Sequence, residues 1–192
     1  IEKTLKLTGA NKAILLKTLR AVIGTLDPTL QDVRISKDLK DTFIIRRGGT
    51  EIIIQEGRLL NREVLSSGTA DGIDVAMFLA AIIARESTFY YCDEHFSYIQ
   101  SDIEKRIFGI MLDRLGNNEQ LIFTTHNTDM LDLNLPKHSY IFLRKQQEDG
   151  IYNVSAISAS EVLKRNTDSI RNAVENDIFA SLPQDSLLDE LE

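Results

Sequence analysis

Residues 89–94 read FYYCDE, a short apolar run that ends in two acids. Residues 120–126 read QLIFTTH and follow the same plan, with a histidine at the end. Short apolar runs of this length indicate buried strands, and residues 101–115, which lie between them, have the apolar spacing of a helix. This order of strand, helix and strand predicts two parallel strands, because parallel neighbours need a long crossover connection.

The polar residues after the two strands are the first candidates for chemistry. Ligands bind outside the carboxyl ends of strands in open α/β sheets, so we expect Asp93, Glu94 and His126 on one rim. Asp93 suits Mg²⁺, which prefers oxygen ligands and keeps much of its water. Glu94 could orient or deprotonate a water for attack on a phosphate, and His126 could contact a terminal phosphate. Each also has a plain structural explanation, as a solvated acid or a structural histidine.

A segment of small residues, LSSGT at 65–69, precedes an apolar helical pattern from about Gly72 to Ala84. A glycine-containing segment at a helix N-terminus offers unpaired backbone N–H groups and the positive end of the helix dipole. Serine hydroxyls add further donors. Taken alone, this segment would be an ordinary N-cap.

The rest of the chain supplies the frame of the fold. Residues 10–24 have helical spacing. Short β-like runs then predict an antiparallel sheet, at residues 33–35, 42–45 and 51–54. The last two are joined by RGGT, which is typical of a hairpin turn.

These patterns together predict an α/β fold in which a parallel sheet is flanked by helices and preceded by a short antiparallel β region. Residues 140–143 are expected to add a third strand to the parallel sheet. We divide the chain into a helix plus antiparallel β segment at 1–64, an α/β lobe at 65–157 and a C-terminal helical tail at 158–192.

The composition narrows the class of protein. The chain has 192 residues, a formal net charge of −7 and a pI of about 5.1. This acidic balance disfavours a broad footprint on a nucleic-acid backbone but leaves a local patch open. No run approaches the ~20 apolar residues of a membrane-spanning helix, and the single cysteine, Cys92, cannot form an internal disulfide. We therefore expect a cytoplasmic protein with no membrane partner and with Cys92 in the core.

The order of the three features resembles the ABC ATPase superfamily. Residues 66–69 look like its signature motif, Asp93 and Glu94 match the Walker B pair, and His126 matches the switch histidine. The resemblance covers about residues 25–183 and identifies the chain as the C-terminal half of an ABC-type head, a fold of the P-loop NTPase class.

Two departures separate the chain from transporter ATPases. His95 replaces the usual proline after the catalytic glutamate, and Gln100 stands where Asp or His is common. The Ser-Ser-Gly-Thr form of the signature is closer to SMC-like and AAA-type stand-alone bacterial ATPases. That group includes ATPases of phage-defence systems and relatives of the OLD nucleases, so phage defence or a DNA-related stress response is the implied setting.

The resemblance implies an ATP hydrolase that uses Mg²⁺ and works as a head-to-head homodimer with ATP at the interface. Glu94 and His126 would be the catalytic residues acting on ATP bound in cis, and Asp93 would serve the metal. The residues of the signature would contact ATP held by the partner: Ser66, Ser67, Gly68 and Thr69. An effector protein or DNA is a further expected partner.

The phosphate-binding loop G-x-x-x-x-G-K-[ST] does not occur in these 192 residues. In the family it lies upstream, so we expect it on an N-terminal part that precedes Ile1. We accordingly expect the isolated chain to be inactive.

Two other functions stay open. The chain could be a structural or regulatory module that binds partners through the same surfaces and hydrolyses nothing, which the missing loop favours. It could also be a Toprim-type nuclease, which needs a Glu and a separate Asp-x-Asp at strand ends. No Asp-x-Asp follows a strand, and Asp132 comes after a helical segment.

Overall fold

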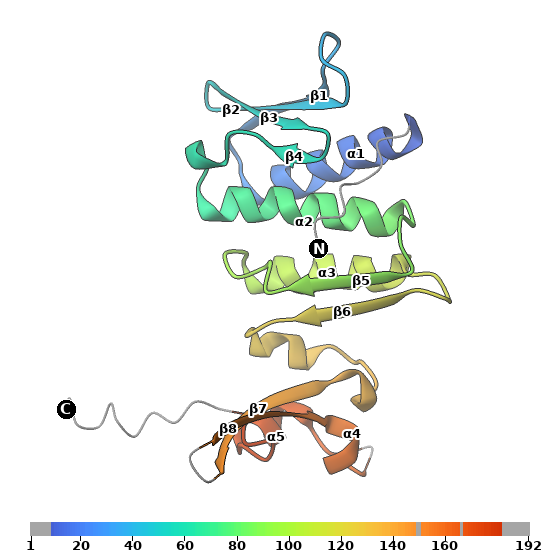
Figure 1. Cartoon of the computed structure of the whole chain (residues 1–192), viewed down its shortest axis with the longest axis vertical. Helices are drawn as coiled ribbons and strands as arrows, with labels where there is room; N and C mark the ends of the chain where they lie inside the picture. Colours follow the sequence, from blue (N-terminus) through green and yellow to red (C-terminus); the bar gives the residue numbers. More distant parts are fainter. Residues whose placement is uncertain (1–8, 149–150, 166, 182–192) are drawn as a thin grey trace, which may run out of the picture. The chain divides into compact units, whose positions relative to one another are not determined.

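The computed structural model describes residues 9–148, 151–165 and 167–181 (Figure 1). The chain divides into two units, Ile1–Asn127 and Thr128–Glu192, called unit 1 and unit 2 below. Each unit has its own cluster of buried apolar residues, and each is described by itself.

Unit 1 begins with a helix on an antiparallel sheet. The helix is α1 (Gly9–Leu26), and the sheet has the order β1-β2-β3-β4. The strands are β1 (Leu30–Ile35), β2 (Thr42–Arg47), β3 (Thr50–Gln55) and β4 (Arg58–Leu59). The predicted hairpin between β2 and β3 is confirmed: Gly48 and Gly49 have φ of 51° and 86°, which suit the tight two-residue turns that glycine allows.

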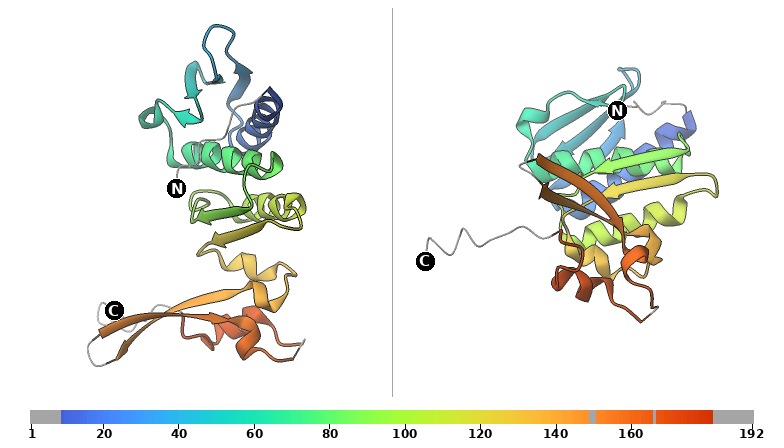
Figure 2. Two further views of the ribbon diagram at one scale, coloured as in Figure 1. Left: turned by 45° about the vertical axis from the view of Figure 1, so that its right-hand side comes forward. Right: turned by 60° about the horizontal axis from the view of Figure 1, so that its bottom comes forward.

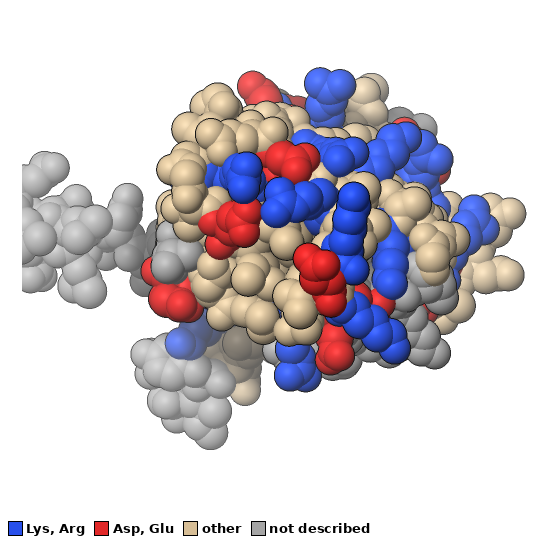
Figure 3. Space-filling view, turned by 90° about the horizontal axis from the view of Figure 1, so that it is seen from above, with Lys and Arg blue, Asp and Glu red and all other residues tan. Residues whose placement is uncertain are grey.

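The two faces of this sheet differ as a half-buried antiparallel sheet requires. Phe43, Ile45 and Ile52 point inward and are fully buried in the core of unit 1. On the outer face, Arg34 and Arg46 lie 3.2 and 3.1 Å from the same Glu51 carboxylate oxygen. Lys and Arg side chains gather on this side of the molecule, with acids among them (Figure 3). The arginines are thus partly neutralised by their neighbours on the sheet.

Helix α2 (Ser67–Ile83) packs along α1, and the two lie between the antiparallel sheet and a second, parallel pair of strands (Figures 1 and 2). The contact is close at Gly72, where an added Cβ would lie 2.6 Å from a methyl carbon of Leu26 and 3.3 Å from one of Ile23. A small residue at this position lets the two helices approach.

The parallel pair is formed by β5 (Phe89–Asp93) and β6 (Gln120–Thr124), joined by α3 (Ser101–Arg114). Both strands and the crossover helix match the prediction. Helix α3 covers one face of the pair, where the Phe108 ring packs at a tilt against Phe123 with the ring centroids 4.7 Å apart. The other face exposes Phe89 and Tyr91 of β5 and Ile122 of β6. The parallel sheet of unit 1 therefore has two strands and one helical cover, whereas the sequence predicted a three-stranded parallel sheet flanked by helices.

Unit 2 contains the residues that were predicted to extend the parallel sheet, and that prediction is wrong. Residues 140–143 belong to β7 (Ile141–Glu148), which pairs antiparallel with β8 (Ile151–Ser158) in a two-stranded sheet of its own. The reason is local: β8 follows β7 almost at once in the chain, and close neighbours in sequence pair antiparallel without a crossover. Strand β8 went unrecognised because its sequence, IYNVSAIS, mixes polar and apolar residues irregularly.

Short helical turns fill the rest of unit 2. They are η2 (Thr128–Asp132), η3 (Lys137–Ser139), α4 (Ala159–Val162) and α5 (Ile170–Glu175). Phe179 is fully buried and stacks on Phe142 of β7 with ring centroids 4.0 Å apart. The predicted helical tail thus consists of two short helices over its described part. The acidic end, with the break expected at Pro183, lies outside the described residues.

Two helix-interior glycines should respond oppositely to substitution. Gly109 of α3 would place a Cβ in open space, so Gly109→Ala should stabilise unit 1 by about 0.5–1 kcal/mol through helix propensity. Gly72→Leu should destabilise it by about 1–3 kcal/mol, because the new side chain overpacks the α1–α2 contact. Chemical denaturation of both variants measures the difference, and equal effects at the two positions would contradict the close packing at Gly72.

Candidate functional site

The carboxyl ends of β5 and β6 meet as the sequence predicted. The register pairs Asp93 with Thr124, so the residues that follow each strand emerge side by side. His126 Nε2 lies 2.9 Å from Glu94 Oε1, with the histidine side chain 87% exposed and the glutamate side chain 49% exposed. The predicted placement of these strand-end residues on one rim is confirmed. Their catalytic roles stay predictions.

Asp93 is oriented by the neighbouring strand. Thr124 Oγ1 donates a 2.6 Å hydrogen bond to Asp93 Oδ1. The pKa of the Tyr91 hydroxyl, on the same exposed face of β5, is raised by partial burial and next by the charge of Asp93. The hydroxyl of Thr124 and the neighbouring Tyr91 side chain thus orient the acid.

Glu94 has an unusual backbone. Its φ is 53°, in the left-handed region that costs a non-glycine residue about 1–2 kcal/mol. The conformation is maintained because the Glu94 main-chain N–H lies 3.2 Å from both the carbonyl and the hydroxyl oxygen of Thr124. Strain of this kind is found at functional sites, but a positive φ is shared by five other non-glycine residues among those described, so it does not by itself mark Glu94.

The N-terminus of α2 begins earlier than predicted. The helix starts at Ser67 rather than near Gly72, so most of the proposed signature segment forms its first turn. The cause is Ser66, which caps the helix: its Oγ accepts from the Thr69 main-chain N at 3.3 Å and lies 2.8 Å from Thr69 Oγ1. Ser66 and Ser67 are exposed, whereas Thr69 is buried by this cap.

A cavity of about 330 Å³ opens beside this helix end. It is lined by Ser66, Gly68 and Thr69, and also by Arg47 and Tyr98. Gly68 approaches the segment after Glu94 closely, since an added Cβ would lie 3.3 Å from the Tyr98 carbonyl oxygen. The first turn of α2 is therefore packed against the loop that leads away from the two acids.

Arg47 is held in the cavity wall by Asp27. The two side chains form an ion pair, and Thr29 donates to Asp27 Oδ1 from its main-chain N at 2.9 Å and from its hydroxyl at 2.6 Å. Burial by itself would raise the pKa of Asp27, but the hydrogen bonds from Thr29 and the charge of Arg47 outweigh it and lower the pKa. The pair fixes the guanidinium at the edge of the cavity.

Sequence reasoning missed a buried acid behind the rim. Glu104 of α3 is only 2% exposed and accepts hydrogen bonds from Thr125 and Asn127, the residues on either side of His126. An acid inside an amphipathic helix pattern is normally read as solvent-facing. The available signal was its place on the apolar side of α3, with Ile107 and Met111.

Of the other residues singled out in the sequence, Cys92 is the one whose predicted place is confirmed. Cys92 is buried, and burial raises its thiol pKa to about 12, so it stays a neutral core residue as predicted. His95 and His138 are exposed, and their structural roles stay predictions; His95 directly follows Glu94 in the chain.

A divalent cation would find few protein ligands here. Within the described ranges, no group of three or more His, Cys, Asp or Glu side chains is placed to hold a metal ion. The oxygens of Asp93 and Thr124 nevertheless suit Mg²⁺, which commonly takes one or two protein oxygens and completes its shell with water and substrate phosphates. The donor set fits such an ion when a phosphate ligand is bound.

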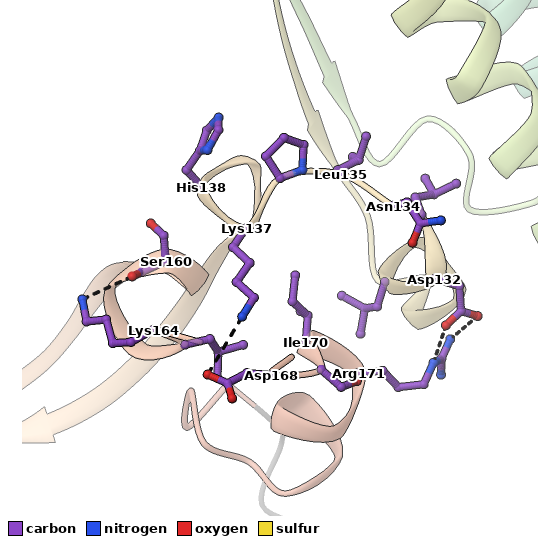
Figure 4. Close-up of a pocket in the computed structure, with 15 residues that line it drawn as sticks. Asp132, Asn134, Leu135, Lys137, His138, Ser160, Lys164, Asp168, Ile170 and Arg171 are labelled. Carbon is purple, nitrogen blue, oxygen red and sulfur yellow. Dashed lines mark hydrogen bonds and ion pairs between the residues drawn. The ribbon is translucent and has the colours of Figure 1, made fainter. Parts of the chain in front are cut away.

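A second depression lies in unit 2, and its walls carry several basic side chains (Figure 4). It measures about 810 Å³, with Lys137, Lys164 and Arg171 on its walls. Arg171 makes two hydrogen bonds to the Asp132 carboxylate at 2.6 and 2.7 Å, and Lys137 lies 3.9 Å from Asp168. Ion pairs and hydrogen bonds thus link the short helices of unit 2 around this depression.

The described residues define a mixed α/β protein with an antiparallel sheet, a small parallel pair and a polar rim. None of the described helices is both long and apolar enough to cross a membrane. No family model matches the chain, and no curated protein matches it in sequence.

Among solved structures, the chain is similar to an SMC head crystallised with the C-winged helix domain of ScpA. The identity is 15% and the TM-score is 0.49; the match covers 79% of this chain and 45% of that chain. The chain thus spans less than half the length of the protein it matches. A likeness this distant carries no argument about function, which has to come from the site itself.

Loss of the helix cap should weaken unit 1. Ser66→Ala removes the acceptor for the Thr69 N–H, and replacing such a cap costs about 0.5–2 kcal/mol. Ser67→Ala is the matched control, because Ser67 is exposed and makes no cap in the described structure. Denaturant unfolding compares the two, and equal stability would show that the cap is not formed in solution.

Proposed function

We propose that this chain is the signature-bearing and catalytic half of an ATP-hydrolysing head of the ABC type, closest to the SMC-like and AAA-type stand-alone group. The observation that carries the proposal is the 2.9 Å contact between Glu94 and His126 at the ends of two adjacent parallel strands, with Asp93 beside them. An acid pair and a histidine that reach one point suit a phosphate and its attacking water.

Each rim residue has a distinct part in this proposal. Glu94 orients and polarises the attacking water, which as general-base help is worth about 10²–10⁴-fold in rate. His126 donates a hydrogen bond to the terminal phosphate. Asp93, oriented by Thr124, is the protein ligand of Mg²⁺, which when bound neutralises charge on the phosphates. Exposure of the histidine leaves it free to turn from Glu94 to a phosphate oxygen.

The first turn of α2 provides the second nucleotide contact. Ser66 and Ser67 are exposed at the positive end of a 17-residue helix, and Gly68 and Thr69 line the adjoining cavity. A helix end of this kind attracts phosphate through its N–H groups and its dipole. We propose that it touches ATP held by a second head, so that two copies form a dimer through nucleotide.

The exposed face of the parallel pair is also evidence for a partner segment that supplies the phosphate-binding loop. Parallel sheets are normally covered on both faces, yet Phe89, Tyr91 and Ile122 on the face opposite α3 are exposed to between 40% and 50%. We propose that an α/β segment with the G-x-x-x-x-G-K-[ST] loop covers this face and brings ATP to the rim. An effector protein or DNA, and a cytoplasmic setting in phage defence or DNA stress, belong to the same proposal.

The same apolar face favours a second candidate, a module that binds a partner and hydrolyses nothing. Exposed apolar residues gathered on one face of a folded unit mark protein interaction sites. ATP turnover in an assembly that includes the phosphate-binding loop separates the two candidates. An ATP-hydrolysing head needs the carboxylate of Glu94 for turnover, whereas a partner-binding module shows no turnover at all.

Glu94→Gln should abolish ATP hydrolysis in the complete head, meaning the assembly that includes the phosphate-binding loop. Gln is nearly isosteric with Glu but cannot act as a base. Nucleotide binding should persist or tighten, because one negative charge near the phosphates is removed. Steady-state ATPase assays and calorimetric titration with Mg-ATP measure the two effects. Turnover at the wild-type rate in this variant would show that Glu94 is not the catalytic carboxylate.

Ser67→Arg should prevent ATP-dependent dimerisation and leave nucleotide binding by each head intact. The bulky side chain would project from the first turn of α2 into the space where the partner's ATP docks. Light scattering with and without ATP reports the dimer, and Ser67→Ala is the control of small size. A dimer that still forms with arginine at this position would place the nucleotide elsewhere.

A further inference from the structure

The loop that carries His126 is anchored from behind by a buried acid. Thr125 Oγ1 donates to Glu104 Oε1 at 2.8 Å, and Asn127 Nδ2 donates to Glu104 Oε2 at 2.5 Å. The two carboxyl oxygens of one side chain thus hold the residues immediately before and after the histidine. His126 itself points away from this anchor and is 87% exposed.

Further hydrogen bonds close the arrangement. The Asn127 main-chain N donates to Thr125 Oγ1 at 3.0 Å, so the two flanking residues are also joined to each other. Asn127 Nδ2 donates to Ser101 Oγ at 2.9 Å. Ser101 and Glu104 are three residues apart and share one side of α3. The loop therefore has a single helix face as its base.

The anchor is rigid because the core of unit 1 holds it. On the same helix, Ile107, Phe108 and Met111 are buried, and Phe108 packs against Phe123 of β6. A carboxyl group buried to this degree is costly unless hydrogen bonds satisfy it. The donors that satisfy Glu104 come from the histidine loop, so the free energy that keeps the acid buried also keeps the loop in place.

We infer that Glu104 is the positioning residue of this site: its buried carboxyl group fixes the loop 125–127 so that the His126 imidazole stays within reach of Glu94. Its importance for catalysis rests on the proposed function, but the geometric claim does not. If Glu104 were only structural, it would stabilise α3 and β6, and its loss would not change the effect of the Glu94 charge on the His126 imidazole.

The test measures whether His126 and Glu94 remain coupled when Glu104 is changed. In the 192-residue chain with ¹⁵N-labelled histidine, Glu94→Gln should shift the His126 Nε2 resonance at fixed pH, because the contacting group 2.9 Å away loses its charge. In the Glu104→Met background the same change should produce less than half that shift. Met preserves the length and apolar packing of the side chain while removing both acceptors.

Two further variants guard against a trivial loss of folding. Glu104→Gln keeps the shape and one acceptor, and it should restore most of the coupling when Asn127 turns its amide oxygen towards the new NH₂ group. Thr125→Val removes the hydroxyl that donates to Glu104 and accepts from the Asn127 main-chain N, and it should reduce the coupling with the core intact. Asp113→Asn, an exposed acid on the same helix, is the control and should leave the coupling unchanged.

The possible results of these experiments separate the positioning role of Glu104 from the proposed ATPase function. A full-sized shift in the Glu104→Met and Thr125→Val backgrounds would overturn the inference, as would a wild-type chain in which Glu94→Gln leaves the His126 resonance unmoved. If the coupling follows Glu104 but the complete head shows no ATP turnover, the positioning stands and the proposed function fails. If turnover is present, Glu104→Gln should retain more of kcat than Glu104→Met, with KM for ATP unchanged in both.

Discussion

The parallel register of β5 and β6 is the constraint on which the site depends. Pairing Asp93 with Thr124 brings the ends of two strands, separated in the chain by a whole helix, to the same edge. A slip of one residue would turn Cys92 and its core neighbours outward and send the acids to the opposite face. The burial of Cys92 in the core of unit 1 therefore enforces the register that places Glu94 next to His126.

Two features of the polar rim cost stability, and hydrogen bonds from one neighbouring segment offset both. Glu94 sits in a left-handed backbone conformation, and Glu104 is an acid inside the core. In both cases the partner is the strand–loop segment that begins at Thr124: its carbonyl and hydroxyl hold the Glu94 N–H, and the next residues satisfy Glu104. The same short segment thus holds both the backbone of Glu94 and the residues that flank His126.

The sequence predicted some parts of the fold well and others poorly. The hairpin at Gly48-Gly49, the crossover helix α3 and the two strands were all legible because each depends on local chemistry: glycines in a tight turn, or apolar spacing of one period. The start of α2 was placed too late, although residues 65–69 were read as a possible N-cap, because the pattern does not say which residue caps; the structure assigns the cap to Ser66, which accepts from Thr69. The strand at 140–143 was assigned to the wrong sheet because strand direction and partner are properties of pairing, which single-strand patterns do not contain.

The order and residue types of the candidate site were determined by the sequence alone: small residues at a helix start, two acids after one strand, a histidine after the next. That information is local, because each residue is adjacent in the chain to the element that presents it. Only the tertiary structure decided that Glu94 and His126 touch, that Arg47 and Tyr98 join the wall beside Ser66, and that Glu104 lies buried behind the histidine. Those relations arise from packing between segments distant in sequence, where burial and hydrogen-bond satisfaction, rather than pattern, select the partner.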